Sequence, residues 1–474
     1  MVFSSIIFLF YFFPLTLLLY FICKNIRYRN ILLLFVSLFF YAYGEPVYIL
    51  IMIASIIINY GAALLMDIRK GSLERKIIMS GAVVLNIGLL VYFKYIDFLI
   101  DIINRVLQLF DPSISIGSLN IALPIGLSFF TFQGLSYVID VYRGEVTAQK
   151  NILKLALYIS MFPQLIAGPI VRYSDVMAEI DERHTKEEDF FNGISRFITG
   201  LSKKVMIADI LAVTADKAFS LGGQQLEPLV AWTGAICYML QIYFDFSGYS
   251  DMAIGIGKIL GFSFPENFNT PYISKSISEF WRRWHMTLGS WFRDYLYIPL
   301  GGNRKGNVYV NLLIVFLCTG LWHGANYTFA IWGLWHGIFI VAERMIKSKK
   351  PGIKIPVVLS QAYTLFVVLI GWVMFRAPGL GSALRYIKAM FGIQKLDTFL
   401  YYNIWYFIDI QILFTILVGA IISMGIPGKL LSKLDLKTNP KLLTAKYVCL
   451  AVLFVISGSM IMNGNFSPFI YFRF

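Results

Sequence analysis

The sequence predicts an all-α integral membrane protein with many membrane-spanning helices. Hydrophobic residues make up 58% of the 474 residues, charged residues only 14%, and the mean hydropathy is +0.69. A soluble protein of this length carries far more charge. Long apolar runs are the second observation, because a helix needs about 20 apolar residues to cross the hydrocarbon core of a bilayer. We therefore expect the chain to fold within a membrane.

Apolar runs of this kind occur along the whole chain. Six of them approach or exceed the spanning length: residues 2–23, 47–66, 77–93, 355–375, 404–424 and 445–463. Six weaker or broken runs are found at residues 31–43, 121–141, 152–171, 229–246, 308–322 and 329–342. From these runs we expect about 11 crossings, together with helices that enter the membrane without crossing it. The first run has no small-residue cleavage site, so we expect it to be retained.

Positive charge is concentrated in the connections between the apolar runs. The formal net charge is +14. The basic clusters comprise Lys24, Arg27, Arg29, Arg69, Lys70, Arg75, Lys76, Lys347, Lys349, Lys350, Lys429, Lys433, Lys437 and Lys441. Basic connections stay on the cytoplasmic side, so both termini are expected outside the cell membrane. This placement accounts for the charge without nucleic acid, which we do not expect as a partner, and it allows contact with anionic membrane lipids.

Two polar stretches interrupt the apolar pattern. Residues 172–204 have mixed charge and predict a solvated cytoplasmic connection. Residues 274–293, SKSISEFWRRWHMTLGSWFR, combine aromatic residues and arginines but lack the length to span. They predict an interfacial or re-entrant helix. His285 would then approach the membrane interior from the cytoplasmic side.

The run TGLWHGANYTFAIWGLWHG at residues 319–337 places two histidines in an apolar region. A helix over residues 308–322 is about 22 Å long, so His323 is expected deep in the membrane, at a bend made by the following Gly-Ala-Asn. Irregular backbone at that depth is tolerated only where it is buried in protein or lines a wet cavity. We therefore favour a functional role for His323. For His336, on the returning helix, we favour packing, with its nitrogens satisfied by a neighbour.

Two carboxylates, Asp245 and Asp251, lie in an otherwise apolar segment. Buried charges are costly unless they are paired. The candidate partners are Arg282, Arg283 and Arg293. We favour an ion-paired anchor between helices. The alternative is that one carboxylate orients a catalytic histidine.

Four long motifs carry a resemblance to a known family. They are FPQLIAGPIVRY at residues 162–173, YFDFSGYSDMAIGIGKILGF at 243–262, FWRRWHMTLGSWFRDYLYIPLGGNRKG at 280–306 with the two Trp-His-Gly motifs that follow, and FIYFRF at 469–474. The chain resembles the membrane-bound O-acyltransferase family, most closely its alginate O-acetyltransferase membrane-subunit branch. The agreement extends from about residue 30 to the end of the chain.

The resemblance implies one membrane domain over residues 1–474, in which tilted and spanning helices surround a central funnel. The catalytic histidine of the family corresponds to His323, and the second histidine to His285. A neutral imidazole in a water-poor cavity can accept a hydroxyl proton as an acyl group transfers. The residues expected to support the funnel are Trp322, Asn326, Asp245, Asp251, Arg282 and Arg283.

The tail at residues 465–474, NFSPFIYFRF, follows the last apolar run and is expected outside the cell. One interpretation is an aromatic anchor at the outer interface. In relatives, a similar FxYFxF motif is also found on a small partner of the teichoic-acid D-alanyl-transfer protein, where its tyrosine is thought to take the acyl group. By resemblance, Tyr471 is a candidate acyl carrier. Both interpretations stay open at this point.

The expected function is the transfer of acetyl groups from a cytoplasmic donor, acetyl-CoA, to a polysaccharide at the cell surface. The resemblance implies a separate external acetyl-transferring partner, and it leaves the polysaccharide open between alginate, cellulose, peptidoglycan and a secondary wall polymer. The four cysteines have no metal-type spacing, so we expect no metal and no bound cofactor. The alternatives are D-alanyl transfer to teichoic acid, against which the built-in FIYFRF argues, and a non-enzymatic transporter, which would also place polar residues at the midplane.

Overall fold

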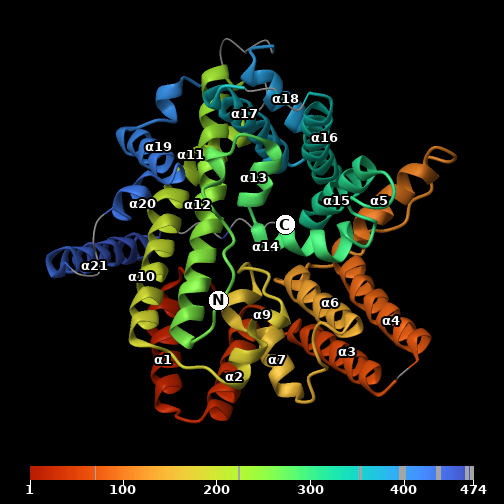
Figure 1. Cartoon of the computed structure of the whole chain (residues 1–474). Coiled ribbons are helices and arrows are strands. Elements are labelled where there is room, and N and C mark those ends of the chain that lie inside the picture. The colour runs from red at the N-terminus through yellow and green to blue at the C-terminus, as the bar shows by residue number, and fades with distance from the viewer. Residues whose placement is uncertain are drawn as a thin grey trace. The chain divides into compact units, whose positions relative to one another are not determined.

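The chain is built of helices joined by turns and loops (Figure 1). The computed structural model describes residues 1–69, 71–221, 225–350, 352, 355–393, 402–433, 439–464 and 469, and no strand occurs among them. These residues form two compact units. The first unit comprises Met1–Gly193 with Ile256–Pro265, and the second comprises Ile194–Gly255 with Glu266–Phe474. The all-α prediction is confirmed, while the prediction of a single domain stays a prediction.

Six helices in the described part are long and apolar enough to cross a membrane. They are Ile49–Ile68, Ser72–Leu107, Pro228–Leu260, Tyr327–Lys349, Val357–Arg376 and Pro440–Met462. Three shorter apolar helices are Phe8–Ile22, Val308–His323 and Ile410–Ser423. The predicted number of about 11 crossings stays a prediction, because some weaker runs form helices below spanning length. Residues 152–171, for example, divide into two short helices just before Pro163, which cannot donate a backbone hydrogen bond.

The first unit contains the helices of the N-terminal part. They are η1 (Phe8–Phe12), α1 (Phe13–Ile22), α2 (Ile26–Gly44), α3 (Ile49–Ile68), α4 (Ser72–Leu90), η2 (Val91–Tyr95), α5 (Ile96–Leu107), α6 (Leu127–Arg143), α7 (Ile152–Ser160), α8 (Phe162–Leu165) and α9 (Tyr173–Asp181). Helices α3, α4 and α6 pack together. Asn59 on α3 and Asn86 on α4 exchange amide hydrogen bonds of 2.9 and 3.2 Å. Gly134 on α6 makes room for this pair, since a Cβ there would collide with Asn59.

The second unit contains the helices that carry the three buried histidines. Helices α10 (Glu187–Lys203) and α12 (Pro228–Leu260) have residues in both units. The others are η3 (Lys204–Ala208), α11 (Asp209–Ser220), η5 (Pro271–Ile273), α13 (Ile277–Arg283), α14 (Met286–Phe292), η6 (Arg293–Tyr297), α15 (Val308–His323), α16 (Tyr327–Lys349), α17 (Val357–Arg376), α18 (Leu380–Met390), η7 (Ile404–Tyr406), α19 (Ile410–Ser423), α20 (Ile426–Leu431) and α21 (Pro440–Met462).

Helices α15 and α16 form the closest helix pair of the second unit, and small residues make this possible. A Cβ at Gly320 would collide with the Phe329 carbonyl, and one at Gly333 would collide with the Phe316 carbonyl. Such close approach between backbones is how membrane helices gain packing energy. The chain reverses where Asn326 caps α16 by accepting a hydrogen bond from the Thr328 amide. The predicted bend after His323 is therefore confirmed.

The helix predicted over residues 274–293 is wrong as a single element. It divides into the two short helices α13 and α14, with Trp284 and His285 at the break. His285 adopts the left-handed conformation, with φ of 45° and ψ of 54°. A residue with a Cβ pays about 1–3 kcal/mol for this conformation, and such strain gathers at functional sites. Trp284 at this break is 2% exposed and so belongs to the core of the unit.

Candidate active site

Three of the four histidines are buried, and all three belong to the second unit. The exposed fractions of His285, His323 and His336 are 1%, 3% and 0%. His184, in contrast, is an exposed residue of the first unit. Imidazole is rarely buried in an apolar protein without a partner or a chemical role. The surroundings of the three rings therefore decide what this unit can do.

His323 is enclosed by aromatic rings at the end of α15. Its ring centroid lies 4.9 Å from Trp322, 5.1 Å from Trp332 and 5.1 Å from Phe375, and each of these rings is nearly perpendicular to the imidazole. The three rings come from α15, α16 and α17. This apolar enclosure favours a neutral imidazole, which can act as a proton acceptor.

His285 is held by the loop before η5. Its Nδ1 lies 3.1 Å from Oδ1 of the buried Asn267, which also accepts hydrogen bonds from the hydroxyl and the amide of Thr287 at 2.9 and 3.3 Å. Because Oδ1 is an acceptor, Nδ1 of His285 carries the proton and Nε2 presents the lone pair. Burial lowers the pKa of His285 to about 3, so the ring is neutral at physiological pH.

Trp322 connects the two predicted catalytic histidines. Its indole centroid lies 6.0 Å from the ring of His285 and 4.9 Å from the ring of His323. Both histidines therefore border one aromatic side chain, although they are 38 positions apart in the sequence, as their numbers show. The structure brings together the two histidines that the resemblance singled out.

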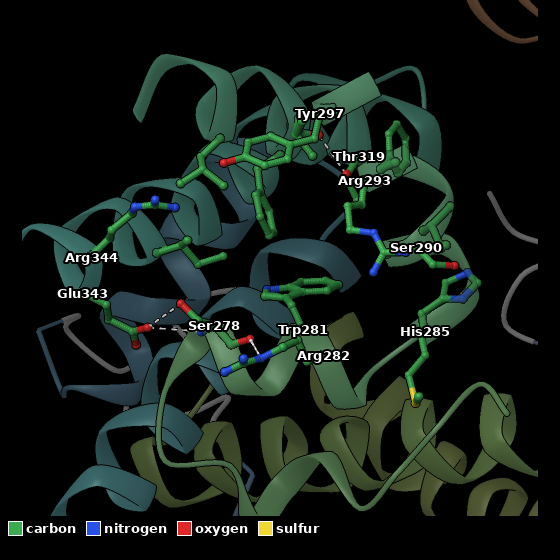
Figure 2. A pocket seen from close by; sticks show the side chains of 18 of the residues that line it. Ser278, Trp281, Arg282, His285, Ser290, Arg293, Tyr297, Thr319, Glu343 and Arg344 are labelled. Atoms are coloured by element: carbon green, nitrogen blue, oxygen red, sulfur yellow. Dashed lines mark hydrogen bonds between the residues drawn. The ribbon is translucent and has the colours of Figure 1, made fainter. Parts of the chain in front are cut away.

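A pocket of about 670 Å³ opens beside His285 (Figure 2). Its wall comes from α13, α14, η6, α15 and α16. The polar and charged residues that line it are Ser278, Arg282, His285, Ser290, Arg293, Tyr297, Asn303, Thr319, Glu343, Arg344 and Lys347. The cations among them are exposed, whereas His285 is buried. The pocket thus has a positively charged rim and a neutral imidazole in its inner wall.

Glu343 joins the two sides of this pocket. Its carboxylate accepts hydrogen bonds from the backbone amides of Ile277 and Ser278 at 2.6 and 3.1 Å, and from the Ser278 hydroxyl at 2.9 Å. A carboxylate at the start of a helix is stabilised by the free amides there. Glu343 on α16 therefore fixes the start of α13, and with it the wall that contains Arg282.

His336 differs from its prediction. The prediction that a neighbour satisfies its ring nitrogens is wrong. Neither Nδ1 nor Nε2 has a hydrogen-bond partner within the described part of the chain. Its ring lies instead edge-on to the indoles of Trp281 and Trp332, at centroid distances of 5.1 and 5.2 Å. The packing of these two indoles against the ring depends on contacts between helices, which sequence spacing does not show.

The carboxylates of α12 are ion-paired, as predicted, but with other partners. Asp245 lies 2.7 Å from Nζ of Lys204, which also pairs with Asp209 at 2.7 Å. Asp251 pairs with Arg196 at 2.9 Å and with Lys203 at 2.6 Å. The prediction of arginine partners from the segment after α12 is therefore wrong. The cations come from α10 and η3, which precede α12 in the chain.

The predicted arginines serve elsewhere. Arg282 is exposed at the pocket rim and donates to the Ser278 carbonyl at 3.2 Å. Arg283 pairs with Glu279 one turn earlier at 2.9 Å and donates to the Asn269 carbonyl. Arg293 pairs with Asp294 at 2.6 Å and also lines the pocket. Arg282 and Arg293 therefore belong to the pocket.

Phe469 is the one residue of the tail that the structure describes, and it packs within the second unit. This residue is 3% exposed, and its ring lies 4.8 Å from Tyr249 and 6.1 Å from Phe246. Phe246 in turn lies 4.7 Å from the ring of His285. The described end of the tail is thus buried close to the neighbours of His285. Tyr471 lies outside the described residues.

Two residues of the site could not be singled out from the sequence. Asn267 sits in a loop without periodic pattern, and its contact with His285 depends on the fold of that loop. Trp332 reads as one of nine tryptophans, yet it contacts both His323 and His336. The only available signal was its place one helical turn before His336, which puts both side chains on one face.

The sequence is similar to that of known acyltransferases. A family model for the membrane-bound O-acyltransferase family matches residues 147–378. The probable alginate O-acetylase of Pseudomonas aeruginosa is 46% identical over 83% of this chain and 75% of its own length. The peptidoglycan O-acetyltransferase of Helicobacter pylori is 37% identical over 84% of this chain and 81% of its own length.

The chain belongs to the membrane-bound O-acyltransferase family. It is an integral membrane protein and an O-acyltransferase, as the sequence motifs predicted. A more distant relative, the teichoic acid D-alanyltransferase of Bacillus subtilis, is 30% identical over 53% of this chain and 68% of its own length. Relatives of this chain therefore differ in the acyl group that they transfer. The acyl donor of this chain has to be argued from its own site.

Proposed function

We propose that this membrane-bound O-acyltransferase takes acetyl from acetyl-CoA on the cytoplasmic side of the cell membrane and delivers it for O-acetylation of a polysaccharide outside. The observation that supports this best is the pocket beside His285, whose inner wall is joined through Trp322 to His323. A donor in this pocket would have its thioester near His285, and Trp322 separates that ring from His323. Acetyl-CoA acts here as a substrate, with no resident cofactor.

The rim of the pocket is suited to the phosphates of coenzyme A. Arg282, Arg293, Arg344 and Lys347 are exposed around it, and guanidinium groups bind phosphate through paired hydrogen bonds. The volume of about 670 Å³ lies within the range of small-molecule sites. Arg344 and Lys347 belong to the basic end of α16, which the distribution of charge assigns to the cytoplasm. This orientation places both termini outside.

The proposed chemistry is acyl transfer with a histidine as proton acceptor. His323 takes the proton from the hydroxyl of the acceptor while the hydroxyl oxygen attacks the thioester carbonyl. The carbon–sulfur bond breaks as the new ester bond forms. The proton ends on the thiolate that leaves, so coenzyme A is released as a thiol. The aromatic enclosure of His323 excludes water and so limits hydrolysis of the thioester.

The acceptor hydroxyl that we propose is that of Tyr471. The one residue of the FIYFRF motif that the structure describes is Phe469, two positions before Tyr471 in the sequence. Phe469 contacts Phe246, a direct neighbour of His285. A purely superficial aromatic anchor would not need this burial. The acetyl-tyrosine would then pass its acetyl to an external acetyl-transferring partner, which esterifies the polysaccharide.

The choice of acetyl over D-alanyl is supported by the relatives. The alginate and peptidoglycan acetyltransferases align over more than four fifths of this chain, and the D-alanyltransferase over about half of it. Among polysaccharides, these relatives support alginate and peptidoglycan as models of the acceptor class, a hydroxyl-bearing glycan outside the cell. D-alanyl transfer and transport without covalent transfer are alternative outcomes of the test.

The deciding experiment supplies labelled acetyl-CoA to inside-out membrane vesicles that contain the protein. We expect covalent label on the protein or on an added glycan, and its loss, by about 10²–10⁴-fold, in His323→Ala. His184→Ala is the matched control, because His184 is exposed and lies in the other unit. Labelling by a D-alanyl carrier protein only, or uptake of label without a covalent bond, would reject the proposal.

A further inference from the structure

His336 is a buried titratable residue that the proposed reaction does not use. It is fully enclosed, and both ring nitrogens lack hydrogen-bond partners among the residues that the structure describes. Burying such a group unpaired destabilises a fold, whereas phenylalanine of similar shape would fill the space without that penalty. A costly polar group in an aromatic cluster indicates a role beyond packing.

Gly371 on α17 brings His336 together with a second unpaired group. A Cβ at Gly371 would lie 2.6 Å from Nε2 of His336 and 3.6 Å from Nε1 of Trp332. Like the imidazole nitrogens, Nε1 of Trp332 has no partner in the described part of the chain. An indole N–H is a donor and a neutral imidazole offers one acceptor, so the two groups are complementary. Both border the same glycine, and they make no hydrogen bond to each other in the structure, so joining them requires a change in ring orientation.

Trp332 lies between His336 and His323. Its indole centroid is 5.2 Å from the ring of His336 and 5.1 Å from the ring of His323, both nearly perpendicular to it. The orientation of this indole therefore decides the shape of the wall against which His323 rests. Trp281, which lines the donor pocket, contacts both Trp332 and His336 and completes the cluster.

We propose that His336 is a positioning residue for the transfer reaction: a rotation of the rings beside Gly371 lets its Nε2 accept the indole N–H of Trp332, and this bond holds the indole that orients His323. This inference rests on the proposed function of His323. An unprotonated Nε2 performs this role, with the proton on Nδ1 directed into the aromatic cluster, where ring faces are weak acceptors. A glycine at position 371 is required, since any side chain would push the imidazole away.

The first test measures acetyl transfer by His336→Phe, which keeps the ring and removes both nitrogens. We expect kcat to fall about 5–10-fold, the effect of one hydrogen bond, with KM for acetyl-CoA unchanged. We expect the thermal stability of the purified variant to change little, because loss of the hydrogen bond from Trp332 is offset by removal of the buried Nδ1–H, which has no strong acceptor among the described residues. His336→Gln restores an acceptor and should recover part of kcat. Unchanged kcat in His336→Phe would overturn the inference.

A double-mutant cycle tests whether His336 acts through Trp332. If His336 acts through Trp332, then His336→Phe and Trp332→Phe together lower kcat no further than the more damaging single change. Gly371→Ala should resemble His336→Phe in kcat. Multiplicative effects in the cycle would overturn the positioning role.

The same experiments separate this inference from the proposed function. His323→Ala reports on the catalytic assignment, and His336→Phe reports on positioning alone. Loss of transfer in His323→Ala with full kcat in His336→Phe would leave the proposed function standing and reject only the role of His336. Normal transfer in His323→Ala would reject the catalytic role of His323, on which both the proposed function and the role of His336 depend.

Discussion

Oδ1 of Asn267 lies 3.1 Å from Nδ1 of His285, and both residues are almost completely buried. The same oxygen accepts the amide and the hydroxyl of Thr287, so its orientation is determined by more than one donor. The contact fixes the tautomer of His285 at the point where the backbone is left-handed. An imidazole held in this way can present Nε2 to the acyl donor in the pocket without first changing its orientation.

The first prediction concerns this contact. Asn267→Ala should lower kcat about 10–100-fold, a part of what a positioned acid or base contributes, because the ring loses its fixed tautomer. KM for acetyl-CoA should change little, since the cationic rim remains. The measurement is transfer of labelled acetyl at several donor concentrations. A variant with an unchanged kcat would show that the tautomer of His285 is irrelevant to the reaction.

The second prediction concerns stability and pH. The folded pKa of His285 is about 3, lowered by burial, whereas an unfolded imidazole has a pKa near 6.5. Between these pH values the unfolded state binds more protons than the folded state. Titration of His285 therefore leaves the free energy of unfolding unchanged above about pH 6.5 and lowers it as the pH falls below that value. Relative to His285→Gln, the parent should lose up to about 2 kcal/mol of unfolding free energy between pH 6.5 and pH 5.

Denaturant unfolding in detergent at a series of pH values measures this difference. The comparison with His285→Gln removes the contributions of all other titrating groups that the two proteins share. Parallel stability curves for the two proteins over this range would mean that His285 becomes protonated in the folded state at an ordinary pH.

The parts of the site that follow from local pattern were predictable. The helix before His323, the bend after it and the returning helix lie within a single continuous stretch of chain, where apolar length and the Gly-Ala-Asn break determine the path. The position of His285 relative to the membrane stays a prediction. The break within its segment was missed, because helix formers surround it and nothing in the composition marks the left-handed residue.

Long-range pairing could not be predicted. Asp245 has several arginines after it in the chain, but its cation is Lys204, which a π-helical turn between α10 and α11 turns inward. Charge counting cannot choose between cations that are equally available, since the choice depends on which helices meet. The same holds for Asn267 and Trp332, whose partners are distant in the chain or common in type.

The third prediction concerns the cluster of Lys204, Asp209 and Asp245. The two carboxylates lie 2.7 Å from the ammonium group, and all three side chains are at most 5% exposed. Lys204→Met removes the shared cation and should destabilise the protein by about 3–5 kcal/mol, because uncompensated charge stays buried. The measurement is thermal unfolding in detergent, together with the amount of inserted protein.

Two further variants control this prediction. Lys429→Met removes an exposed lysine and should leave stability within about 0.5 kcal/mol. Adding Asp245→Asn to Lys204→Met removes one buried charge and should recover part of the loss. Equal stability of the parent and Lys204→Met would mean that the cluster contributes nothing to the fold.

The last prediction separates an aromatic anchor from an acyl carrier at Tyr471. Tyr471→Phe keeps the aromatic ring and removes only the hydroxyl, so an anchor predicts little change and a carrier predicts almost complete loss of O-acetylation. With labelled acetyl-CoA and no external acceptor, a carrier should accumulate one alkali-labile acetyl on the C-terminal peptide, and this label should disappear in His323→Ala. A short extension beyond Phe474 should also reduce the label, because the tail has to enter beside Phe469, which is already buried against Tyr249. If Tyr471→Phe acetylates normally and the tail peptide never carries label, transfer must pass directly from the donor to an external hydroxyl at His323. The aromatic tail would then act as an anchor, held by the burial of Phe469.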